Sequence, residues 1–269
     1  MKSASTLSSA FLQPAGQTLP ASLLALRFDR ASALADLVLP SRKTENWKYS
    51  AKHLKLTDDM ASTLPLDASV ETATDMSGYT IVLVNGVVRP QASSYPTLEG
   101  LSVQRFRDLS EDDATLAADL MKKSISDQPA KAGSVNLSLL NGARFEDGLL
   151  IQLQPGTVVD QPLFVIHHTT ANHSGSAYPC ILVAAGNNSQ LTLVEDYVSS
   201  GDSPVMVNTT TEFSLGDGAN VTSVRLNTEG QTVQHMGTTG VRQQRSSRFE
   251  SHSVGFGGTL RRHDLHVRL

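Results

Sequence analysis

The chain has 269 residues, a formal net charge of −4 and a single cysteine. A chain of this length can bury roughly three quarters of its unfolded surface, so it can form a core without disulfides or metals. The negative charge offers no attraction for a phosphate backbone, which argues against a nucleic-acid partner.

Three further features bear on the cellular compartment. The single cysteine, Cys180, cannot form an internal disulfide. The first residues lack the apolar segment of roughly 7 to 15 residues that a secretory signal requires. No apolar run reaches the roughly 18 residues of a membrane span. The sequence therefore predicts a cytoplasmic protein without a membrane segment.

The first expected element is an amphipathic helix between Pro20 and Pro40. Its apolar stripe recurs every three or four residues and comprises Leu24, Phe28, Ala31, Leu34 and Val38. Charged residues fill the opposite face, namely Arg27, Asp29, Arg30 and Asp36. Pro40 ends the helix because proline has no N–H to donate and restricts the residue before it.

The segment PSRKTENWKYS, residues 40–50, holds the only tryptophan of the chain. Trp47 and Tyr49 are two residues apart, so an extended backbone would place both rings on one side. The favoured interpretation is an aromatic anchor for the helical segment, surrounded by solvated charges on Arg42, Lys43, Glu45 and Lys48. The alternative is a protein-binding surface, since Trp, Tyr and Arg are enriched at binding hot spots.

Three local patterns follow. Residues 57–78 are rich in Thr, Ser, Asp and Ala and predict a loop or linker. Within residues 79–88, the pair Asn85-Gly86 lies between β-branched residues and predicts a hairpin. Ser110 resembles the start of a capping box and predicts a second helix, with acids in its first turn and lysines near its end.

At about Leu149 the character of the sequence changes to β. Short runs rich in Val, Thr and Leu end at Gly, Asn or Asp, with no helical pattern between them. The apolar residues before four similar turns are spaced by 32, 30 and 39 residues: Leu153, Ala185, Leu215 and Val254. A period near 30 predicts the stacked rungs of a β-solenoid, with a sandwich or jelly roll as the alternative.

These patterns predict a mainly β protein whose solenoid follows a helical N-terminal region. Three regions are expected: a helical region with a linker over 1–78, short strands with a helix over 79–147, and the β region over 148–269.

Histidine pairs are the first candidates for chemistry, as metal ligands. His167 and His168 are adjacent, and His263 and His266 differ by an odd number of positions. Within strands the side chains of each pair therefore point to opposite faces, so we expect no metal site. Cys180 precedes an apolar run and is expected to be a small buried hydrophobic residue.

Carboxylates are the second candidates. Glu195 and Glu212 could share a face on neighbouring rungs and act as acid and base in a carbohydrate-active β-helix enzyme. The favoured interpretation is solvated acids on the outside of the strands, so no catalytic residue is assigned. A third class, an adhesive solenoid, would be exported and strongly repetitive, and this sequence is neither.

Several motifs also resemble the SufD branch of the SufB/SufD family, which belongs to the Suf iron–sulfur cluster assembly machinery. The Arg-Lys-x-Glu-x-Trp-Lys-Tyr pattern at 42–49 is similar to an N-terminal signature of that family. The run VLVNGVV at 82–88, the segment at 139–165 and the last residues, RFESHSVGFGGTLRRHDLHVRL, are similar to later family motifs in the same order. The resemblance covers nearly all of residues 20–269.

This resemblance implies a helical region followed by a flattened right-handed parallel β-helix. It implies a non-catalytic cytoplasmic scaffold subunit that pairs with SufB-like and SufC-like subunits. The iron–sulfur cluster would belong to the whole complex, with no cofactor bound directly by this chain. The signature residues would be structural or interface residues: Arg42, Lys43, Glu45, Trp47, Lys48 and Tyr49.

The sequence departs from the family pattern at its end. Family chains continue past the position of Leu269 into a helical region that carries the SufC contact and a histidine at the SufB interface. We therefore expect a fragment of a longer product, without the SufC contact. That histidine cannot be assigned here, and neither His263 nor His266 is equated with it.

Overall fold

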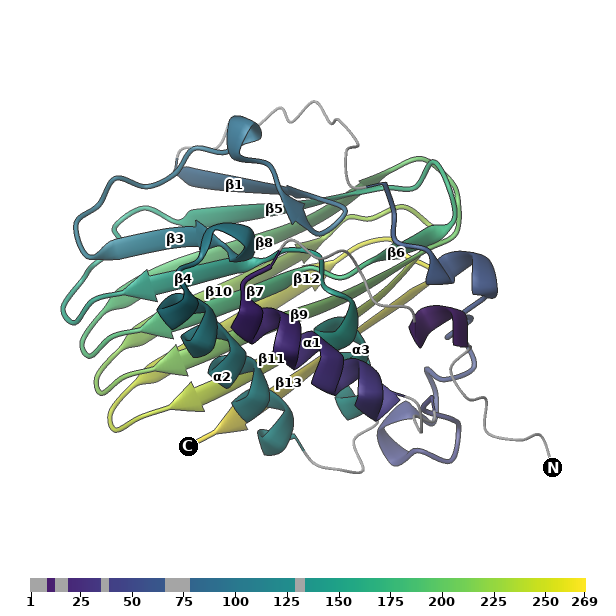
Figure 1. Cartoon of the computed structure of the whole chain (residues 1–269), viewed down its shortest axis with the longest axis horizontal. Helices are drawn as coiled ribbons and strands as arrows, with labels where there is room; N and C mark the ends of the chain where they lie inside the picture. Colours follow the sequence, from purple (N-terminus) through teal and green to yellow (C-terminus); the bar gives the residue numbers. More distant parts are fainter. Residues whose placement is uncertain (1–8, 13–18, 35–38, 66–77, 129–133) are drawn as a thin grey trace.

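The computed structural model describes residues 9–12, 19–34, 39–65, 78–128 and 134–269. Two sheets face each other, and three helices lie across the outside of one of them (Figure 1). The helices are α1 (Ala21–Leu34), α2 (Glu111–Asp127) and α3 (Ser134–Arg144). Short 3-10 turns occupy Ser9–Leu12, Glu45–Trp47, Asp58–Ala61, Pro90–Ala92 and Phe106–Asp108.

One sheet has six strands in the order β12-β10-β8-β5-β1-β2. Their bounds are β1 Tyr79–Val84, β2 Val87–Val88, β5 Leu163–Thr170, β8 Gln190–Ser200, β10 Asn220–Asn227 and β12 Arg248–Gly255. The other has seven strands with the path β13-β11-β9-β7-β4-β3, and β6 also pairs with β9. These are β3 Leu101–Arg105, β4 Leu149–Leu153, β6 Gly175–Ala177, β7 Cys180–Ala185, β9 Val205–Leu215, β11 Val233–Gln243 and β13 Leu260–Arg268.

From β4 onwards the chain alternates between the two sheets, and neighbouring strands are parallel. This is the predicted parallel β-helix. Leu153, Ala185 and Leu215 lie in register, as expected, but the next residue in that row is Gln243. The spacings are therefore 32, 30 and 28 residues. The choice of Val254 was wrong, because the turn that follows it lies between β12 and β13 at the other end of the rungs.

Helix α1 forms where it was expected, but its buried face differs from the predicted stripe. Leu23, Leu26 and Leu34 are buried, whereas Phe28 is 57% exposed. Arg27, predicted in solvent, is buried with its guanidinium 5.6 Å from the ring centre of Phe145. Contacts with α3 and α2 set the rotation of this helix, and the sequence of one helix does not contain them. The predicted position of Val38 lies outside the described residues.

The predicted hairpin and second helix are both confirmed. Asn85 and Gly86 have φ of 53° and 84°, as a tight turn between β1 and β2 requires. Ser110 accepts a hydrogen bond from the Asp113 N–H at 3.2 Å and caps α2. The linker expected over 57–78 contains the 3-10 turn Asp58–Ala61, and residues 66–77 lie outside the described part of the chain.

Helix α3 and strand β3 were not predicted. The sequence of α3 does not predict a helix, because it contains Asn141 and Gly142, which are both poor helix formers. Asn141 Nδ2 donates to the carbonyls of Pro179 (3.0 Å) and Asn208 (2.7 Å), so this polar residue fastens the helix to the solenoid. Tertiary contacts therefore outweigh the weak local preference of the segment.

The hydrophobic core has two main parts. One fills the solenoid between the sheets and includes Ile81, Leu149 and Val241. The other lies between the helices and the outer face of the seven-stranded sheet, where Met206 and Met236 contribute. Helix α1 shares this second part with α2 and α3. The division into three regions stays a prediction.

Candidate functional site

The tryptophan of the signature segment is fully buried in the 3-10 turn Glu45–Trp47. The Arg262 guanidinium, from β13, lies 4.1 Å from the ring centre of Trp47. Arg262 also donates to the Asn46 carbonyl at 2.6 Å and forms an ion pair with Asp264 at 2.6 Å. The segment is thus tied to the solenoid across 216 positions of sequence, which is the arrangement that an aromatic anchor requires.

Tyr49 does not share the side of Trp47, contrary to the expectation for an extended backbone. The segment forms turns, so the two-residue alternation of a strand does not apply, and Tyr49 is 78% exposed. Its ring lies 5.5 Å from Lys48 Nζ. The other exposed signature residues are Arg42, Lys43 and Glu45. Their binding role stays a prediction.

The histidine pairs diverge as predicted. His167 is buried inside the solenoid, while His168 on the outer side of β5 contacts Ser200 Oγ at 3.0 Å. His263 contacts Thr239 Oγ1 at 2.8 Å, and burial lowers its pKa to about 3. His266 lies on the outer face of the seven-stranded sheet. In the described part of the chain, no group of three or more His, Cys, Asp or Glu side chains could hold a metal ion.

A buried network of polar side chains inside the solenoid was missed at the sequence level. Glu195 accepts hydrogen bonds from Tyr197 at 2.5 Å and Thr211 at 2.8 Å. Arg225 forms an ion pair with Glu195 at 3.5 Å, and its guanidinium lies 4.4 Å from the ring centre of Tyr197. The ring of His167 stacks on Tyr197 with 4.2 Å between the ring centres. Burial and, to a smaller extent, the charge of Arg225 lower the pKa of His167 well below its usual value.

The network continues through His235 on β11. Arg225 Nη2 lies 3.1 Å from His235 Nε2, and His235 Nδ1 lies 2.7 Å from a carboxylate oxygen of Glu229. Because a guanidinium only donates, Nε2 accepts and the proton on Nδ1 is donated to Glu229. Glu195 and Tyr197 share one face of β8 by strand alternation, but alternation does not show that this face is the inward one or that Arg225 of β10 lies beside Glu195.

Comparisons with known proteins match most of the β region to a family model and most of the chain to a curated protein. Residues 167–269 match the family model described as SUF system FeS cluster assembly, SufBD core domain. An iron–sulfur cluster assembly SufBD family protein of Synechocystis is 25% identical over 255 residues, which is 88% of this chain and 54% of that protein. The chain is therefore similar to the SufBD family of iron–sulfur cluster assembly proteins, and residues 167–269 are similar to the core domain of that family.

A second relative carries a more specific name. The iron–sulfur cluster assembly protein SufD of Bacillus subtilis is 25% identical over 215 residues, covering 76% of this chain and 48% of that protein. The chain spans about half the length of the curated relatives it matches. None of its described helices is long and apolar enough to cross a membrane.

The hypothesis that Glu195 and Glu212 form a catalytic pair of carboxylates is wrong for this chain. Glu195 lies on the six-stranded sheet and points into the solenoid, where Thr211 of the facing sheet contacts it. Glu212 follows Thr211 and points the opposite way, into a pocket beside Leu120 of α2. The seven-stranded sheet separates the two carboxylates, so they cannot act on one substrate as acid and base.

The favoured expectation for these two acids, solvation on the outside of the strands, is also wrong. Glu195 is 1% exposed and Glu212 is 5% exposed. The inward face of β8 is polar at Glu195, and the outward face of β9 is covered by helix α2 at Glu212. Neither property can be derived from the strand that carries the acid.

Cys180 is fully buried at the start of β7 and belongs to the core beneath the helices. Burial raises the pKa of its thiol well above the usual value, and the nearby charge of Glu212 raises it further. The thiol is therefore not activated for nucleophilic or metal chemistry in this chain. The prediction of a small buried hydrophobic residue is confirmed.

Proposed function

We propose that this chain serves as a SufD-type scaffold subunit of iron–sulfur cluster assembly, paired with a SufB-like subunit. A SufC-like ATPase would join at the level of the complex, in the cytoplasm. The chain would perform no catalysis itself, and the cluster would belong to the complex. The observation that carries the proposal is the match to an iron–sulfur cluster assembly protein, which is 25% identical and extends over 88% of this chain.

The interior of the solenoid supports a scaffold role. Its charged side chains are used by one another: Arg225 pairs with Glu195, and His235 pairs with Glu229. A reactive carboxylate would need access to a substrate, but Glu195 is fully buried. The described chain therefore offers outer surfaces for contact, with its interior groups serving the fold.

The exposed part of the signature segment supports a contact surface. The buried side chain of Trp47 anchors the segment. Tyr49 is exposed to solvent, as are three cations of the segment, Arg42, Lys43 and Lys48. A rigidly held aromatic side chain beside cations is the composition that protein interfaces favour. We propose that this surface contacts another subunit of the complex.

The test is co-expression of the full chain with the SufB-like and SufC-like subunits of its own organism, followed by size-exclusion chromatography with light scattering. We expect a stable complex that contains the SufB-like subunit. Tyr49→Ala should weaken assembly about tenfold or more if the residue is a hot spot. Elution of the folded chain apart from its partners would overturn the proposal.

A matched control separates the surface from the function. Phe28 is also an exposed aromatic residue, on α1, so Phe28→Ala should leave assembly unchanged. If both variants assemble like the unaltered chain, the complex uses another surface and only the interface assignment fails.

A further inference from the structure

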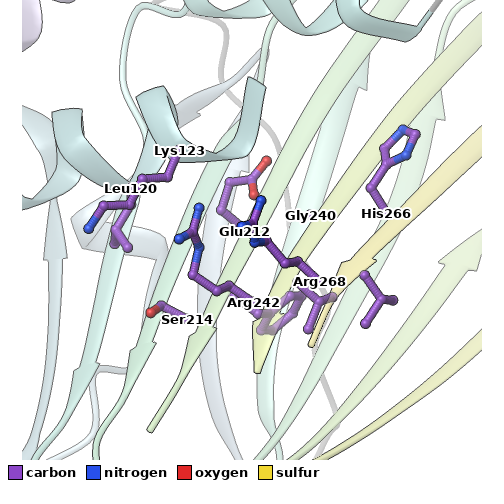
Figure 2. A pocket seen from close by; sticks show the side chains of 11 residues that line it. Leu120, Lys123, Glu212, Ser214, Gly240, Arg242, His266 and Arg268 are labelled. Atoms are coloured by element: carbon purple, nitrogen blue, oxygen red, sulfur yellow. The ribbon is translucent and has the colours of Figure 1, made fainter. Parts of the chain in front are cut away.

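A basic pocket lies on the outer face of the seven-stranded sheet, below the last turns of α2 (Figure 2). The space that it encloses is small, about 30 Å³, and it is open to solvent. Its charged side chains come from four elements: Lys123 from α2, Glu212 from β9, Arg242 from β11 and Arg268 from β13.

The strand register creates this pocket. Glu212, Gly240 and His266 lie side by side on β9, β11 and β13, and the next outward row contains Arg242 beside Arg268. Gly240 has no side chain, and a Cβ atom there would overlap the carboxylate of Glu212. The missing side chain in the middle of the row therefore leaves the space that Glu212 enters.

Positive charge outnumbers negative charge in the pocket. Figure 2 shows the side chains of Arg242 and Arg268 extending toward Glu212. With Lys123 at the rim, three cations and one carboxylate line the space, and that carboxylate is buried. Burial lowers the pKa of His266, so its ring adds no charge at neutral pH. The chain as a whole has a net charge of −4, so the positive charge here is a local property of the pocket.

We propose that this pocket binds a phosphate-type oxyanion, either free or as the end of a phosphate ester. Guanidinium groups present paired N–H donors that match the oxygens of such a group, and a lysine ammonium adds a compact charge at the rim. Glu212 lies beside the two arginines, where its charge offsets part of their mutual repulsion. This inference does not depend on the proposed scaffold function.

Titration calorimetry on the full chain at constant ionic strength tests the proposal, with inorganic phosphate and glycerol phosphate as probes. We expect saturable binding of at least one probe, and the stronger of the two identifies the source. Arg242→Gln and Arg268→Gln should each weaken binding about tenfold, the loss expected for a charge-assisted hydrogen bond. Glu212→Gln should strengthen it severalfold, because a repelling charge is removed.

Arg245→Gln is the matched control, since Arg245 is an exposed arginine in the turn after β11 and outside the pocket. It should bind the probes like the unaltered chain, and thermal melting should show that each variant is folded. The proposal is overturned if neither probe binds, or if the folded Arg242 and Arg268 variants bind like the Arg245 control. Loss of binding in a folded Glu212→Gln variant would also overturn it.

Discussion

The interior of the β-helix is apolar at one end of its rungs and polar at the other. In the apolar rows, Leu163 stacks on Leu193, and Leu191 stacks on Val221. Further along β8 and β10, Glu195 stacks on Arg225. Both ends are equally buried, so the solenoid combines two different ways of filling one interior.

The two ends contribute differently to specificity. Sliding a strand by two residues keeps the same set of side chains inside, so the apolar rows tolerate such a slip. The same slip would separate Arg225 from Glu195 and leave buried charges without partners, which is strongly unfavourable. We infer that the apolar end supplies most of the stability and that the polar end fixes the register of the rungs.

The largest expected effect comes from breaking the polar end. Arg225→Ala leaves the carboxylate of Glu195 buried without its ion-pair partner, so the free energy of unfolding should fall by about 3–5 kcal/mol. Urea denaturation measures this change. The exposed control Arg245→Ala should change stability by less than about 0.5 kcal/mol. Equal stability of the two variants would contradict a register role for the network.

The apolar end should respond in a graded way. Leu193→Ala removes a fully buried side chain and should reduce the free energy of unfolding by about 3 kcal/mol, through lost transfer energy and a cavity. Leu193→Met keeps the volume and should reduce it by less than about 1.5 kcal/mol. The same denaturation experiment distinguishes them. A Met variant as unstable as the Ala variant would show that the apolar rows also demand one specific shape.

A smaller effect should come from Asp147, a buried acid outside the solenoid interior. Burial raises its pKa to about 6, although the N–H groups of Val88 and Arg107 donate to it and the Arg107 side chain lies 3.8 Å away. The folded state therefore holds this proton more tightly than the unfolded state. This group favours folding most below its unfolded pKa of about 4, and the contribution is lost as pH rises to 6.

Comparison of the unaltered chain with Asp147→Asn isolates this contribution. Between about pH 4 and pH 6 the stability of the unaltered chain relative to the variant should fall by about 2 kcal/mol. Thermal melting across this pH range measures the difference. A constant difference would mean that burial does not favour the protonated form of Asp147.

The candidate sites show how far sequence patterns reach. The burial of Trp47 could be expected from its type and setting, but its partner Arg262 could not, because the two lie near opposite ends of the chain. The inward and outward sides of His167 and His168 followed from strand alternation alone. The prediction that Glu195 and Glu212 share a face failed for a different reason. Strand alternation does not say which sheet each strand joins, and these two residues lie in different sheets.

The sequence by itself determined the solenoid, the Asn85-Gly86 turn and the capped helix that begins after Ser110. These features depend on local backbone preferences and on the spacing of similar rungs. Only the tertiary structure decided that Gln243 completes the row of Leu153, that α1 turns Phe28 outward, and that Arg225 meets Glu195. Such outcomes depend on which side chains from distant segments pack in the same buried space. The sequence of one segment does not show which other segment it packs against.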